Sequence, residues 1–171
     1  MPGVHLVNNL PESFIPQSHK NECVLNALSI VAGITEGIDP ESVKSNLKQI
    51  LLGYGVEWEK EGIYNTDIRK IFYDNYAILD DNYYNETTVE SYIGETKKPV
   101  MAIVDVIGTI ITPYEPTDNS HMIAIIGYDY LYYYCAVGYE DPCAIPKKDL
   151  NVTDSNGNPK YKIYFYNGKK L

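Results

Sequence analysis

Apolar residues recur at helical spacing in the first part of the chain. One face of residues 21–32 carries Val24, Ala27, Leu28 and Val31. This pattern predicts a helix, and Asn21 is placed to cap it by accepting hydrogen bonds from amides in the first turn. Most of the remaining positions are apolar as well, which is typical of a helix buried inside a domain. Gly33 is predicted to end this helix.

Three further helices are predicted before residue 95. The pair Asp39-Pro40 combines a capping residue with proline at the first helical position, and the apolar positions that follow predict an amphipathic helix up to Gly53. Shorter helices are predicted over residues 66–72 and 88–94, each with a threonine at its start. Helices are therefore expected to dominate the first half.

After Pro99 the pattern changes to β-branched and aromatic runs. These runs predict strands over residues 100–106, 122–128, 131–139 and 160–166. Residues 128–130 are expected to form the corner of a hairpin, and residues 154–159 form a strong turn signal before the last strand. Helices followed by an antiparallel sheet predict an α+β fold.

Length and composition limit the classes of protein to consider. The chain has 171 residues, 44% apolar and 22% charged, which predicts a single globular domain over residues 1–171. A formal net charge of −9 argues against a surface that binds nucleic acid or anionic membranes. The longest apolar runs are far shorter than the roughly 18 residues of a membrane span. We therefore expect a soluble protein without membrane insertion.

The number and spacing of the cysteines and histidines argue against a disulfide scaffold and against a metal site. Cys23, Cys135 and Cys143 cannot all pair within the chain, so at least one thiol is free or pairs outside it. Their spacing from the histidines is not that of zinc ligands. We expect neither a metal nor another cofactor. The N-terminus carries no recognisable secretory signal.

Cys23 is the candidate nucleophile. It stands near the start of the predicted buried helix, where unpaired amides and the helix dipole favour a thiolate over a thiol. The alternative is that Cys23 is a small apolar core residue, which is the commoner role of a cysteine taken by itself.

Gln17 lies six positions before Cys23, on an extended segment that leads into the helix. A side-chain amide held beside the Cys23 backbone amide would supply two donors to an oxyanion, as acyl transfer requires. A glutamine in a loop is by itself usually a solvated polar residue, so this role depends on the rest of the set.

His121 is the best of three candidates for the general base. It opens the apolar run at residues 122–126 and follows a polar loop, so its ring is expected on a rigid strand at the edge of a cleft. His5 lies near the terminus. His19 lies between Gln17 and the helix, where lining the cleft or contacting solvent is the expected role.

Asp141 is the best-placed acidic group to orient the imidazole of His121. If residues 121–139 form a hairpin, Asp141 returns to the same end of the sheet as His121. Glu140 and Asp129 are rivals on the other face and at the far corner. The alternative for the Asp-Pro pair at 141–142 is a turn that simply ends the strand.

In this order and spacing, Gln17, Cys23, His121 and Asp141 resemble the papain-like cysteine peptidase superfamily, and within it the peptidase C39-like family. Residues 17–23 resemble the family's oxyanion glutamine and helix-borne nucleophile. Residues 121–129, ending in Gly-Tyr-Asp, resemble its histidine strand, and residues 140–142 resemble its Asp-Pro site. The polar stretch from residue 95 to Lys98-Pro99, and the apolar strand that follows, are similar to the strand that precedes the histidine.

The resemblance implies a papain-like fold, with an N-terminal helical half that carries the nucleophile packed on a C-terminal antiparallel sheet. It also implies a bacterial thiol protease, a hydrolase that cleaves a peptide or protein substrate with a catalytic triad of Cys23, His121 and Asp141 and with Gln17 at the oxyanion. A secreted or periplasmic location with any leader removed is expected, and a cytoplasmic one stays open. Val24 departs from the family, since a β-branched residue after the nucleophile is expected to crowd the substrate carbonyl.

Two other functions fit the same residues. The triad could deamidate, transamidate or acylate a protein instead of hydrolysing a peptide bond. The fold could also be a catalytically silent module that holds a peptide, and crowding at Val24 favours this function. The sequence leaves open the substrate, the oligomeric state and the pairing of Cys135 with Cys143.

Overall fold

A computed structural model describes residues 3–63, 77–105, 113–114 and 120–169 of the chain. Its helices are α1 (Cys23–Glu36), α2 (Pro40–Gly53), α3 (Trp58–Glu61), α5 (Glu86–Thr96) and α6 (Lys147–Leu150). Its strands are β1 (His5–Leu6), β2 (Ala77–Tyr83), β3 (Val100–Asp105), β4 (Ser120–Tyr128), β5 (Tyr132–Ala136), β6 (Cys143–Pro146) and β7 (Lys162–Lys169). The predicted α+β fold is confirmed.

The strands form one sheet in which every described pairing is antiparallel. The order is β2-β7-β3-β4-β5-β6, and the short β1 also pairs with β4. The predicted antiparallel sheet is therefore confirmed. The sequence did not predict β2, because its run of Asp80, Asp81 and Asn82 lacks the β-branched pattern typical of strands.

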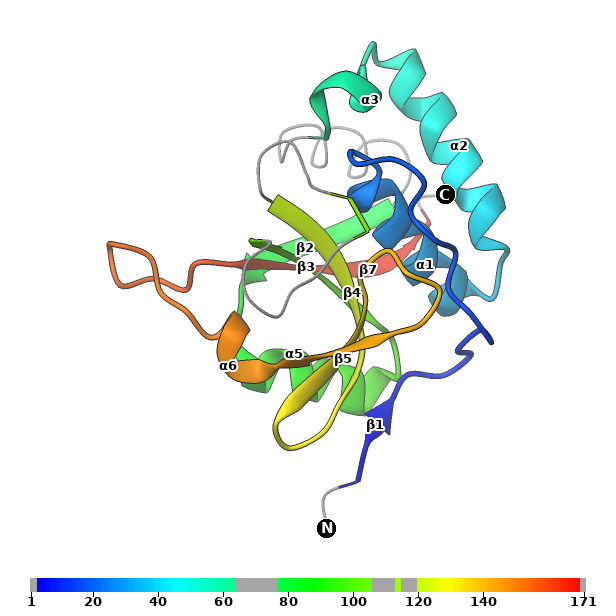
Figure 1. Cartoon of the computed structure of the whole chain (residues 1–171). Coiled ribbons are helices and arrows are strands. Elements are labelled where there is room, and N and C mark those ends of the chain that lie inside the picture. The colour runs from blue at the N-terminus through cyan, green and yellow to red at the C-terminus, as the bar shows by residue number, and fades with distance from the viewer. Residues whose placement is uncertain (1–2, 64–76, 106–112, 115–119, 170–171) are drawn as a thin grey trace.

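Helix α1 lies between α2 and the sheet (Figure 1). It packs against β3, β4 and β7 on one side and against α2 on another. Leu25, Leu28 and Val31 are fully buried, as expected for a helix that is apolar nearly all round. Strand β4 is buried at every position from 121 to 127, so both of its faces are covered.

Both predicted ends of α1 need correction. The helix begins at Cys23 after Glu22, while the side chain of Asn21 donates to the carbonyl of Glu59 instead of capping the helix. It also continues past Gly33 and ends at Gly37, which adopts a left-handed conformation with φ of 67°. Gly33 has a packing role, because a Cβ atom there would lie 3.0 Å from the carbonyl oxygen of Ile38.

The other helices agree in part with the prediction. Helix α2 begins after the Asp39 cap and ends at Gly53, as predicted. Helix α5 begins at Glu86, two residues before the predicted threonine, because the side chain of Asn85 accepts from the Thr88 amide and acts as the cap. The helix predicted over residues 66–72 lies outside the described residues.

The two predicted turns are confirmed. The hairpin between β4 and β5 turns at Asp129, whose side chain accepts from the amides of Leu131 and Tyr132. Before β7, the side chain of Asp154 accepts from the amides of Asn156 and Asn158. The predicted strand over residues 131–139 is shorter in the structure, since β5 ends at residue 136.

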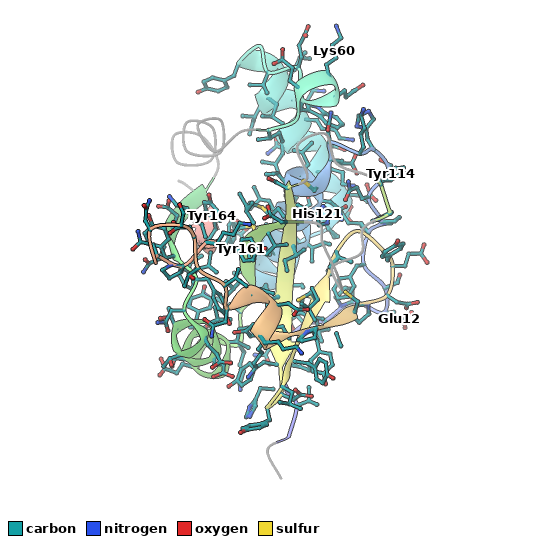
Figure 2. All side chains as sticks on the ribbon, turned by 60° about the vertical axis from the view of Figure 1, so that its left-hand side comes forward. Glu12, Lys60, Tyr114, His121, Tyr161 and Tyr164 are labelled. Atoms are coloured by element: carbon teal, nitrogen blue, oxygen red, sulfur yellow. The ribbon has the colours of Figure 1, made fainter. Side chains whose placement is uncertain are left out.

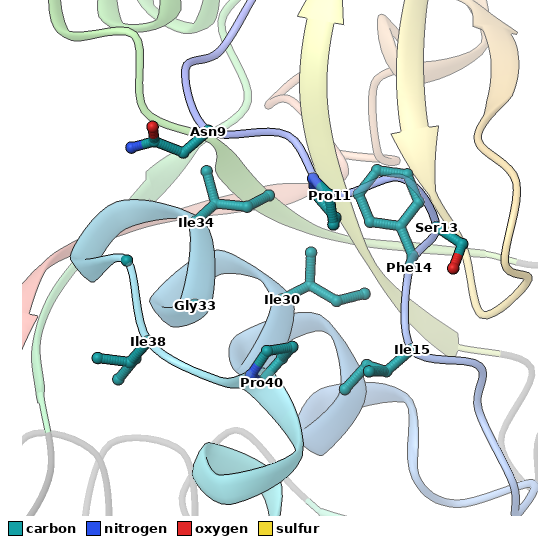
Figure 3. A pocket seen from close by; sticks show the side chains of 11 residues that line it. Asn9, Pro11, Ser13, Phe14, Ile15, Ile30, Gly33, Ile34, Ile38 and Pro40 are labelled. Carbon is teal, nitrogen blue, oxygen red and sulfur yellow. The ribbon is translucent and has the colours of Figure 1, made fainter.

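An apolar cavity of about 210 Å³ lies at the C-terminal end of α1 (Figure 3). Phe14 from the lead-in segment, Ile30 and Ile34 from α1, and Pro40 from α2 contribute to its walls. Cys23 is at the opposite end of the same helix. The cavity is therefore separate from the candidate site described next.

Candidate functional site

Cys23 is the first residue of α1, as predicted, and its side chain is partly exposed. The amides of the first turn of a helix point out of its end, and the dipole there favours negative charge. Its neighbour Val24 is 5% exposed and belongs to the hydrophobic core. The Val24 side chain thus packs inside the protein, and its crowding of the substrate carbonyl stays a prediction.

Glu22 ties the helix start to α2 and to the lead-in segment. Its carboxylate accepts from the Nζ atoms of Lys44 at 2.6 Å and Lys48 at 3.2 Å, although its side chain is fully buried. It also accepts from the amide and the hydroxyl of Ser18, at 3.1 and 2.9 Å. Burial raises the pKa of Glu22, but the bonds from Lys44 and Ser18 outweigh it and hold this pKa below its usual value.

A second set of contacts holds the same segment on its other side. Nδ1 of His19 accepts from the amide of Asn21 at 3.1 Å, and its ring meets Trp58 edge to face with centroids 5.5 Å apart. Lys48 Nζ lies 5.1 Å from the centroid of the Trp58 ring. His19 therefore helps to fix the loop before Cys23, a structural contact that the sequence did not suggest.

His121 lies near the upper end of β4 in the view of Figure 2, inside the molecule. Its side chain is 1% exposed, and Nε2 lies 2.7 Å from the carbonyl oxygen of Val137. A carbonyl only accepts, so Nε2 carries the proton and Nδ1 of the neutral ring is the basic nitrogen. Burial lowers the pKa of His121 to about 4, despite the opposing effect of the Val137 bond.

Gln17 and His121 contact adjacent residues of the segment that follows β5. The backbone amide of Gln17 donates to the Gly138 carbonyl at 2.9 Å. The neighbouring Val137 carbonyl accepts from the His121 ring. Gly138 has φ of 118°, and a Cβ atom there would lie 2.9 Å from Gln17 Oε1 and from Pro113. Only glycine fits this position without displacing a neighbour.

The side-chain amide of Gln17 is buried and faces the loop before Cys23. Its Nε2 donates to the carbonyls of His19 at 2.7 Å and Lys20 at 3.4 Å. Its Oε1 has no hydrogen-bond partner among the described residues. Both amide hydrogens are thus directed at backbone carbonyls, and the 3.4 Å bond to Lys20 is the weaker of the two.

Asp141 is exposed, and among the described residues it makes no hydrogen bond to His121. The described partner of the His121 ring is the Val137 carbonyl, at Nε2, and not the carboxylate that we expected to orient the ring. The structure thus connects Gln17 and His121 through Val137 and Gly138 and leaves Asp141 outside this group. The role of Asp141 stays a prediction.

The roles of Gly138 and of the partners of Glu22 were not predicted from the sequence. Gly138 interrupts a run predicted as one strand, and an isolated glycine in a strand signals a close backbone approach, so this residue could have been found. Lys44 and Lys48 give no such signal. On an amphipathic helix, two lysines indicate a solvated face until the fold brings a buried carboxylate to them.

Comparisons with known proteins address the fold. No family model matches the chain, and no curated protein matches it. Among solved structures, a putative C39-like peptidase from Bacillus anthracis superposes with a TM-score of 0.55 at 16% sequence identity, over 98% of this chain and 100% of that one. The chain has the fold of C39-like peptidases.

A second solved structure with this C39-like fold is a double glycine motif protease from an AMS/PCAT transporter, in complex with the leader peptide. It superposes with a TM-score of 0.57 at 14% identity, over 99% of this chain and 98% of that one. The papain-like fold that the four residues implied is therefore confirmed. Among the described residues, no helix has the length and apolar character needed to cross a membrane.

Proposed function

We propose that this protein is a cysteine peptidase in which Cys23 is the nucleophile and His121 the base. One observation carries the proposal: Cys23 opens a helix that packs against β4, the strand of His121, while His121 and Gln17 contact adjacent residues at 137 and 138. The C39-like fold supports it, since two solved structures that share this fold are described as a putative peptidase and a protease.

The first step transfers the thiol proton of Cys23 to His121. Because Nε2 is occupied by the Val137 carbonyl, Nδ1 takes the proton. The sulfur attacks the substrate carbonyl, and a tetrahedral oxyanion forms. Nδ1 then gives its proton to the departing amine, which leaves an acyl group on Cys23. Water, deprotonated by the same nitrogen, hydrolyses this thioester and restores the thiol.

The oxyanion would be held by the backbone amide of Cys23 and the side chain of Gln17. For Gln17 to donate, one of its hydrogens must leave a loop carbonyl, and the 3.4 Å bond to Lys20 is the one that costs least to break. Substrate binding would thus exchange this bond for a charge-assisted one, which is stronger than a bond between neutral groups.

Labelling with an epoxide or vinyl sulfone tests the proposal directly. We expect one adduct, on Cys23, in folded protein at neutral pH. Cys143→Ser is the matched control, because Cys143 is also partly exposed, and it should label as the wild type does. Cys23→Ala should not label. His121→Gln should label at least about 10²-fold more slowly than the wild type, as expected on loss of a general base. Folded wild-type protein that never reacts would contradict the proposal.

A catalytically silent peptide-binding module is the second candidate. The 1% exposure of the His121 side chain and the internal bonds of both Gln17 hydrogens favour it, since neither group is presented to a ligand. Binding of a peptide by wild type and by Cys23→Ala with equal affinity, without any product, would support the module. If product forms, mass spectrometry distinguishes cleavage from deamidation or acyl transfer to a protein.

A further inference from the structure

Cys135 and Cys143 face each other across two neighbouring strands. Strands β5 and β6 run antiparallel, and their register places Cys135 opposite Cys143 without any irregularity. Residues directly opposite in an antiparallel pair project to the same side of the sheet. Cys135 is fully buried there, and Cys143 packs against the same core while remaining partly exposed. The two thiols are therefore neighbours.

The spacing of such a pair suits a disulfide. Opposite residues in antiparallel strands have Cα atoms about 4.5 or 5.5 Å apart, and disulfides span Cα separations of about 4.4–6.8 Å. Burial raises the pKa of both thiols, and the nearby Cys143 raises the pKa of Cys135 further.

The hydrogen-bond pattern of the two strands determines which kind of pair this is. The Lys147 amide donates to the Leu131 carbonyl, so residues 131 and 147 are a hydrogen-bonded pair. Hydrogen-bonded and non-hydrogen-bonded pairs alternate along antiparallel strands. Two residues further along each strand, Tyr133 and Ile145 are therefore again a hydrogen-bonded pair. After two more residues, Cys135 and Cys143 are a hydrogen-bonded pair as well.

This class of pair predicts a strained disulfide. In hydrogen-bonded pairs the Cβ atoms lie at the long end of about 4.5–5.5 Å, whereas a disulfide requires about 3.5–4.5 Å. The strands must move together to close the bond. Strain of this kind makes a disulfide easier to reduce.

We propose that Cys135 and Cys143 form a reversible cross-strand disulfide when a low-molecular-weight disulfide such as oxidised glutathione is present. Thiolate attack from the partly exposed Cys143 on glutathione disulfide releases one glutathione and leaves a mixed disulfide. The Cys135 thiolate then attacks the Cys143 sulfur and releases the second glutathione. The protein loses two protons and two electrons, and the glutathione disulfide gains them as two thiols.

The proposed bond would enclose the segment between β5 and β6. That segment includes Val137, which contacts His121, and Gly138, which contacts Gln17. The cross-link would therefore restrict the part of the backbone that bonds to the His121 ring and to the Gln17 backbone amide. Its formation does not depend on the proposed peptidase activity.

Thiol counting tests the proposal. Protein is incubated with oxidised glutathione, denatured, alkylated and digested with chymotrypsin, which cleaves after Tyr139 and separates the two cysteines. We expect the Cys135 and Cys143 peptides to be joined, with Cys23 outside that bond. Reduction by excess glutathione should release both. The Cys23→Ser variant should give the same joined peptides, which excludes a bond through the candidate nucleophile.

Cys143→Ser is the second variant, and it should yield no joined peptide. Folded wild-type protein in which Cys135 and Cys143 both remain open to alkylation would overturn the proposal, as would glutathione retained on Cys143 alone. A joined pair that resists excess glutathione would contradict its reversibility. None of these readouts uses peptidase activity, so a failure here is distinct from a failure of the proposed function.

Discussion

The two sides of the candidate site are held by different forces. On the nucleophile side, buried charges fix the start of α1, because Glu22 accepts from Lys44, Lys48 and Ser18. On the base side, His121 lies in an apolar sheet, and within the described part of the chain its ring has one hydrogen bond, to the Val137 carbonyl. One side depends on ion pairs inside the protein, and the other depends on burial.

This difference shows how each side should respond to change. A buried carboxylate is tolerated only while its partners stay, so removing one member leaves an uncompensated charge. A buried imidazole is tolerated only while it is neutral, so its environment resists protonation. The nucleophile side should therefore be sensitive to mutation of charged residues, and the base side to acid.

The largest expected effect is on the nucleophile side. Glu22→Ala should lower the free energy of unfolding by about 3–5 kcal/mol, because Lys44 would stay buried without its partner. Denaturant titration measures this change. Glu57→Ala is the matched control, since the Glu57–Lys60 pair is exposed and should contribute less than about 1 kcal/mol. Equal effects of the two substitutions would remove the proposed contrast.

The base side should lose stability in acid. The pKa of His121 is about 4 in the folded protein and 6.5 in the unfolded chain, so between these values the unfolded chain binds more protons. Stability should fall as pH decreases through this window, by about 2–3 kcal/mol from this residue. His121→Gln should reduce the fall, as measured by denaturant titration of both proteins from pH 7 to 4.5. The carboxylates, Glu22 among them, are the same in both proteins, so the difference between the two pH curves reports on His121.

If the stability of His121→Gln falls with pH as much as that of the wild type, other groups cause the acid sensitivity. The comparison is informative because glutamine retains a donor for the Val137 carbonyl while losing the titrating ring. The wild type and His121→Gln then differ mainly in whether the side chain at position 121 can acquire a positive charge.

Gly138 connects the two sides, and replacing it should have an intermediate effect. Gly138→Ala should cost about 1–3 kcal/mol, because φ is 118° and the new Cβ would collide with Gln17 and Pro113. Gly157→Ala is the control, since its φ is also positive at 80° but nothing lies within 4 Å of a Cβ there. Thermal unfolding of both variants separates collision from backbone strain. Identical losses would mean that the contact with Gln17 is unimportant.

The smallest expected effect is that of Asp141→Asn. Because the Val137 carbonyl occupies Nε2 of His121 and Asp141 is exposed, labelling of Cys23 should change less than about twofold. Inhibitor labelling rates at neutral pH measure this. A fall of about 10³-fold or more is expected if the carboxylate orients the ring. Such a fall would show that Asp141 reaches His121 in the working protein.

The sequence predicted the elements that depend on local patterns. The α1 helix followed from its apolar spacing, and α2 from the Asp39-Pro40 start. One of its errors was at a position where two elements meet. Gly33 was expected to end a helix, but it lets the chain entering α2 approach α1, and this contact cannot be inferred from spacing along one segment.

For the candidate site, the sequence by itself determined which chemical groups are present and which of them begin an element: Cys23 at a helix and His121 near the start of a strand. Only the tertiary structure decided what holds them. The Val137 carbonyl is a backbone group that every residue type has, so no sequence pattern marks it as the partner of His121. Lys44 reaches Glu22 across 22 residues because burial makes an ion pair necessary there, and burial is a property of the folded chain.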